Sequence, residues 1–175
     1  MSALLVCLTL TVPPDRGMAS GRDAPPQEVI IPPKPTRDDI PERNHQGRGN
    51  GILTLPTTSV TRLPDGQIAV MFGYITGSPN GRSSFYIWNT PLNLFCQGAV
   101  MKSETGSGEG EILCSHDGRL MMRDKMVIPA EVYMRFHGTL QHQNRDLDGN
   151  PVWTVLRWRA GRSFPDPAPL IEAFR

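Results

Sequence analysis

The sequence predicts an all-β domain, an antiparallel meander that forms a small barrel or a sandwich, preceded by a disordered N-terminal segment. Two observations carry this prediction. After Gly51, short apolar runs alternate with turn signals, as in strands joined by hairpins. Before that point, prolines and charges of both signs dominate, and such a segment buries too little apolar surface to offset its ordering entropy. We therefore divide the chain into residues 1–20, 21–51 and 52–175.

The first four expected strands each end at a recognisable turn. Residues 51–63 (GILTLPTTSVTRL) run to the turn PDG, and residues 67–77 (QIAVMFGYITG) run to SPNG. The Asn-Gly pair in SPNG is the usual two-residue hairpin turn. Residues 82–90 (RSSFYIWNT) lead through PLN into residues 94–102 (LFCQGAVMK). Together they predict two hairpins in sequence.

The second half of the domain repeats this alternation. Residues 109–115 (EGEILCS) stop at HDG, and residues 119–128 (RLMMRDKMVI) stop at a proline. Residues 130–142 (AEVYMRFHGTLQH) run to DLDGNP, and residues 152–160 (VWTVLRWRA) end at a glycine. The tail PAPLIEAFR is expected to form no more than a helical turn. About eight strands are therefore expected.

Composition restricts the partners of the chain. Its 18 basic and 17 acidic residues leave a formal net charge of +1. Long-range attraction to nucleic acid or to an anionic membrane needs a clear excess of one sign, so neither is expected as the main partner. No cofactor and no metal site is predicted, because no motif with the required ligand spacing occurs.

The N-terminal segment points to export. The uncharged run Ala3–Val12 is too short to cross a bilayer but matches the apolar region of a secretory signal. Cys7 within LLVC resembles the lipidated cysteine of bacterial lipoproteins, although an upstream start codon would be needed. A buried N-terminal strand is the alternative. Residues 21–51 then form a Pro-rich linker, and the N-terminus could tether the protein to a membrane.

Two of the three cysteines flank a Gly-rich run. A three-residue loop Glu104-Thr105-Gly106 would place glycine where the backbone must turn left-handed. In that register Cys96 lies opposite Cys114, at a separation that suits a disulfide. Zinc would need a fourth ligand besides these two cysteines and His116, and a redox dithiol normally has CxxC spacing. We favour the disulfide over a buried pair of free thiols.

The same stretch carries a resemblance. Its glycines and cysteines, in CQG, GEG and CSHDGR, resemble a pattern in small exported, lipoprotein-like β-rich proteins of Gram-negative bacteria. The likeness covers about two dozen residues around the hairpin. It implies export and β structure, and therefore a periplasmic or outer-membrane location, and it implies no activity.

Two stretches copy parts of known catalytic or metal sites. Asn144, Asp146, Asp148 and Asn150 alternate as at the start of a calcium loop, but Val155 stands where the bidentate carboxylate is required. His116 stands beside Asp117 and could be an oriented base, yet no Ser or Cys nucleophile is identifiable beside it. His137 and His142 are more simply exposed side chains at the end of a strand.

The strand WTVLRWRAGR is the best candidate binding surface. Alternation puts Trp153, Arg157 and Arg159 on one face and Trp158 on the other, so one tryptophan should be core and one exposed. Arg162 adds a third positive charge just after the strand. These five residues could bind a polyanion, a glycan or single-stranded nucleic acid. The alternative is an ordinary solvated face whose arginine stems cover apolar edges.

These observations predict a non-catalytic, exported β-domain that is a structural or binding component of the bacterial envelope, with an envelope protein or glycan as partner. The first alternative is a module that binds single-stranded nucleic acid or another polyanion on an OB-like barrel. The second is a small hydrolase-like enzyme that uses His116 and Asp117.

Overall fold

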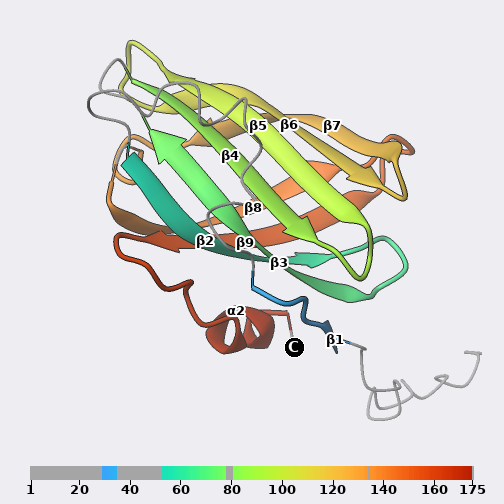
Figure 1. Cartoon of the computed structure of the whole chain (residues 1–175). Coiled ribbons are helices and arrows are strands. Elements are labelled where there is room, and N and C mark those ends of the chain that lie inside the picture. Colours follow the sequence, from blue (N-terminus) through green and yellow to red (C-terminus); the bar gives the residue numbers. More distant parts are fainter. Residues whose placement is uncertain (1–28, 35–52, 78–80, 134, 175) are drawn as a thin grey trace, which may run out of the picture.

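A computed structural model of the chain describes residues 29–34, 53–77, 81–133 and 135–174. Its sheet curls into a nearly closed antiparallel barrel of eight strands, so the all-β prediction is confirmed, in its barrel form (Figure 1). The elements are β1 (Val29–Ile30), β2 (Leu53–Arg62), β3 (Ile68–Gly77), β4 (Arg82–Asn89), β5 (Leu94–Lys102), β6 (Gly108–His116), β7 (Arg119–Ile128), β8 (His137–Arg145), β9 (Pro151–Arg159) and α2 (Ala168–Glu172).

The barrel is an up-and-down meander. Hydrogen-bonded neighbours follow the order β7-β6-β5-β4-β3-β2-β9-β8, so the chain circles once and β9 returns to β2. A seam remains between β7 and β8. Hydrogen bonds between described residues cross it: the Arg145 amide donates to the Asp124 carboxylate at 3.0 Å, and the Leu147 amide donates to the Met121 carbonyl at 3.0 Å. This barrel differs from the OB-like alternative, which is a five-stranded Greek-key fold.

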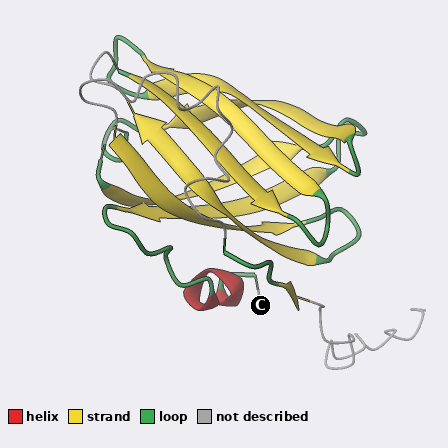
Figure 2. Cartoon of the chain, in the orientation of Figure 1, coloured by secondary structure: helices red, strands yellow, loops and turns green. Residues whose placement is uncertain are grey.

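Alternation along the strands produces two apolar cores. The inner face of the strands fills the barrel, with Phe85, Cys96 and Leu156 among its members. The outer face of β2, β3 and β9 is also apolar, and α2 lies against it below the barrel (Figure 2). Arg62 fastens this cover: its guanidinium donates to the Phe174 carbonyl and stacks over the Phe174 ring. This short helix, Phe164 before it and Val29 of β1 together shield a second, smaller core.

Two segments differ from the sequence predictions. The expected strand at residues 130–142 begins only at His137, because residues 130–133 form turns in which the amides of Val132 and Tyr133 donate to the Pro129 carbonyl. Within the expected linker, β1 pairs in parallel with the start of β3, and buried Asn89 donates to the Ile30 carbonyl at 3.1 Å. Strand pairing and one buried amide supply the docking energy that composition alone did not suggest.

Several N-terminal predictions lie outside the described residues. These are the signal-like segment at residues 1–20, Cys7 within it, and the linker apart from residues 29–34. In the part of the chain that the structure describes, no helix has the length and hydropathy needed to span a bilayer.

Candidate ligand cavity at the mouth of the barrel

The two ends of the barrel are built differently. We call the end that carries the β5–β6 turn and the β7–β8 loop (residues 129–136) the mouth, and the opposite end the base. Tight turns close the base, and each contains a residue with positive φ, which glycine and asparagine tolerate best. These residues are Gly66, Asn93, Asp117, Gly118 and Gly149.

A cavity of about 200 Å³ lies inside the mouth. Its inner layer is apolar and buried, and consists of Leu55, Phe85, Val100, Met126 and Leu156. Its outer layer includes Leu53, Ser83, Ile128 and Trp158, each two residues nearer the mouth than an inner-layer residue of the same strand. Val132, Tyr133, Arg135 and Phe136 of the loop complete it. Cavities of roughly 150 Å³ in protein cores accept benzene, so this one has room for a small organic molecule.

Two aromatic side chains hold the β7–β8 loop across the mouth. The Tyr133 hydroxyl donates to the carbonyl of Gly81, at the start of β4. Trp158 of β9 points into the barrel, and its indole N–H donates to the Arg135 carbonyl at 2.9 Å. Trp158 is 5% exposed and Tyr133 is 6% exposed. The loop is therefore fixed at both of its halves by buried anchors.

Glycines on neighbouring strands leave room for these rings. A Cβ at Gly108 of β6 would lie 2.4 Å from the Tyr133 ring. A Cβ at Gly138 of β8 would lie 2.5 Å from the Trp158 ring. Both distances are too short for any side chain, so each glycine is required by an anchor of the loop.

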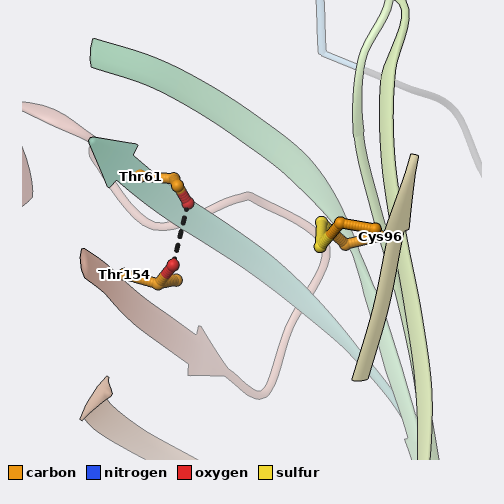
Figure 3. The surroundings of a disulfide bond; sticks show 4 residues. Thr61, Cys96 and Thr154 are labelled. Carbon is orange, nitrogen blue, oxygen red and sulfur yellow. Dashed lines mark hydrogen bonds between the residues drawn. A yellow bond between two sulfur atoms is a disulfide. The ribbon is translucent and has the colours of Figure 1, made fainter. Parts of the chain in front are cut away.

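The disulfide predicted between Cys96 and Cys114 is present inside the barrel. The two cysteines are directly paired on β5 and β6, and their Cα atoms are 4.1 Å apart, as in a pair without mutual hydrogen bonds. The predicted register also holds at the turn, where Gly106 has φ of 86°. Figure 3 shows the sulfurs projecting toward the side where Thr61 and Thr154 share a hydrogen bond of 3.1 Å.

The structure separates the residues predicted to bind on β9. Trp158 points into the barrel, whereas Trp153 lies on the outer face and is 40% exposed. Arg157 donates to the Thr139 hydroxyl at 3.1 Å. The prediction of one core and one exposed tryptophan is confirmed.

The other two arginines lie at the end of β9. Arg159 donates to the Ser163 hydroxyl at 2.6 Å and to the Ser163 carbonyl at 3.2 Å, which fastens the segment leading to α2. Arg162 is exposed in the loop that follows. Trp153, Arg157 and Arg159 therefore share an outer face, and two of them already contact neighbouring parts of the chain.

The other candidate sites do not assemble. The imidazole of His116 and the carboxylate of Asp117 are 3.8 Å apart, beyond hydrogen-bond distance, at an exposed turn of the base. Asn144 is buried within β8, away from the calcium-like turn that follows. Among the described residues, no three His, Cys, Asp or Glu side chains are grouped to hold a metal ion.

Asp146 has a structural role in that turn. Its carboxylate accepts hydrogen bonds from the side-chain amide of Asn150 at 2.9 Å and from the backbone amides of Asn150 and Asp148. These bonds hold the pKa of Asp146 below its usual value, and the bond from the Asn150 side chain contributes most. The carboxylate therefore organises the β8–β9 turn.

Comparison with protein-family models, with curated proteins and with solved structures gave no match. The cavity is a feature that sequence reasoning missed, because its residues come from six strands and one loop. The local signal was the proline at 129, which begins a turn where a strand was expected.

Proposed function

We propose that this protein is a non-catalytic, exported binding domain of the bacterial envelope, which holds a small apolar molecule in the mouth of its barrel. The observation that supports this most is the apolar cavity between the inner layer and the β7–β8 loop. Small eight-stranded barrels commonly bind one ligand in this position. Ligand pockets are typically lined by apolar and aromatic side chains with few polar groups.

The interior disulfide supports the export part of the proposal. Buried disulfides persist in oxidising compartments such as the periplasm and are rare in the cytosol. The resemblance around Cys96 and Cys114 favours the same compartment. The N-terminal segment with Cys7 would supply the signal and the membrane tether.

Binding can be tested with neutral probes. We expect octanol and naphthalene to bind the purified chain with one-site saturation in calorimetry and to raise its melting temperature. The substitution Leu53→Trp should abolish both effects, because residue 53 is a half-buried lining residue whose larger ring would occupy the cavity. The matched control is Leu92→Trp, which enlarges a half-buried residue packed on the core at the base.

Retained probe binding in a folded Leu53→Trp variant, or no binding by the unaltered protein, would overturn the ligand proposal. Export is tested separately, by fractionating cells that express the chain with its native start region. Non-reducing mass spectrometry of the exported fraction should find the Cys96–Cys114 bond. Two free thiols in folded protein that stays in the cytosol would contradict export.

A further inference from the structure

The cavity carries its charge at one end only. The inner layer contains no polar side chain, and its five residues are at most 7% exposed. The polar lining side chains are Ser83 and Ser84 of β4 and Tyr133 and Arg135 of the loop. Ser83 is 9% exposed and is paired with Val100 of the inner layer. Arg135 is the only charged residue among the described lining residues. A molecule that fills this space therefore meets hydrocarbon at its inner end and a cation at its outer end.

The Arg135 side chain is exposed and held in place by its own loop. Its Nε donates to the Glu131 carbonyl at 3.0 Å, and its own carbonyl accepts the Trp158 indole N–H. The bond to Glu131 uses one of the five N–H donors of a guanidinium, whose planar fork matches a carboxylate. The backbone of Arg135 is thus fixed to a wall of the cavity.

Other basic side chains lie at the same end. Arg82 and Lys102 are exposed, and the Lys102 amide donates to the Gly81 carbonyl that also accepts the Tyr133 hydroxyl. The acidic residues at this end are Glu104 and Glu131 on the adjoining turns and Glu109 at the start of β6. All three are exposed, and none of them lines the cavity. The charge that faces a ligand inside the mouth is therefore positive.

We infer that the ligand is a monocarboxylate with an alkyl chain of medium length, with its tail against the inner layer and its carboxylate at Arg135. This inference rests on the proposed function, since it specifies the ligand of the same cavity. The apolar inner layer excludes a second charge at the far end of the ligand. The small volume favours a single short chain over a lipid with two acyl chains.

The test compares three probes of equal chain length and different head groups. Octanoate, octanol and octylamine are titrated into the whole chain by calorimetry at neutral pH. We expect octanoate to bind about tenfold more tightly than octanol, because a hydrogen bond between charged groups contributes about that much to affinity. Octylamine should bind most weakly, because its positive charge would lie near Arg135. In Arg135→Gln, octanoate should fall to the affinity of octanol, while octanol is unchanged. Arg145→Gln removes the same charge at the base and should alter nothing.

The outcomes separate the two proposals. If octanol binds as tightly as octanoate, or if Arg135→Gln leaves octanoate binding unchanged, the carboxylate inference is wrong and the apolar-ligand function stands. If none of the three probes binds the folded protein, both proposals are wrong. Salt should weaken octanoate binding and leave octanol binding unaffected or stronger, which checks the charge contribution independently of any substitution.

Discussion

The mouth and the base of this barrel use the same strands and differ in how their ends are filled. At the base, tight turns bring the strands together, and buried Leu63, Leu94, Met122 and Val152 fill the interior. At the mouth, the β7–β8 loop is longer and is anchored by hydrogen bonds of Tyr133 and Trp158. The space left beneath the loop is the cavity.

This difference shows how a barrel keeps a packed core and an open site in one short chain. The disulfide links the neighbouring strands β5 and β6, and the hydrogen bond between Thr61 and Thr154 links the neighbouring strands β2 and β9. The anchors of the loop instead cross the opening, and each needs a glycine on the adjacent strand. The packed interior should therefore contribute mainly to stability, and the mouth mainly to binding. Substitutions in the two regions should separate these effects.

The largest effect is expected at Trp158, which belongs to the core and also lines the cavity. Trp158→Ala should lower the free energy of unfolding by about 3–5 kcal/mol, because it empties a large buried volume. It should also weaken probe binding, because the cavity loses an apolar wall and the loop loses its hydrogen bond at Arg135. Urea unfolding and calorimetry measure the two effects.

Trp158→Phe is the control for that change. It keeps most of the ring and loses the N–H that donates to Arg135, so about 1 kcal/mol should be lost. A loss in Trp158→Ala no greater than in Trp158→Phe would show that the ring itself contributes little.

Removal of the disulfide should destabilise the barrel without affecting the mouth. The double substitution Cys96→Ala and Cys114→Ala should cost about 3 kcal/mol, as expected for a crosslink that closes a loop of this size. Octanol affinity of the folded variant should stay within twofold of the unaltered protein, as measured by calorimetry. Reduction of the unaltered protein, checked by thiol titration, is the matched comparison. A large loss of affinity at constant folding would mean that the two layers are coupled.

The outer face of β9 should respond more weakly. Arg159→Ala should cost up to about 1 kcal/mol, because it releases the segment at Ser163 that leads to α2. Arg157→Ala, which loses one exposed bond to Thr139, should cost less. Thermal melting measures both. Capture of envelope glycans or proteins by the two variants tests the predicted binding strand, and unchanged capture would leave it an ordinary solvated face.

The smallest effect is expected at the base, and it depends on pH. The folded-state pKa of Asp146 is lowered, so its contribution to stability is present above the unfolded pKa, near 3.8, and is lost as the pH falls through the folded value. Asp146→Asn should therefore be less stable at neutral pH, with a difference that shrinks in acid. Denaturation at several pH values measures this, with Asp148→Asn as the control for lost charge. A difference that stays constant with pH would contradict this role for the carboxylate.

The strands, the turns and the disulfide register could be predicted from local pattern. Apolar alternation, turn dipeptides and a left-handed glycine at 106 act between residues near in sequence, and they place Cys96 opposite Cys114. The same alternation assigned Trp153 and Trp158 to opposite faces. Sequence by itself therefore determined the β class, the hairpin around the cysteines and the placement of the two β9 tryptophans on opposite faces.

Only the tertiary structure decided between barrel and sandwich, and only it revealed the cavity. Closure depends on β9 returning to β2, a pairing of residues about a hundred positions apart that no local pattern specifies. The described residues between β7 and β8 leave strand geometry, and they are fixed by bonds from Tyr133 to Gly81 and from Trp158 to Arg135, both between residues distant in sequence. Such contacts form only when the barrel closes, so the site is a property of the assembled fold.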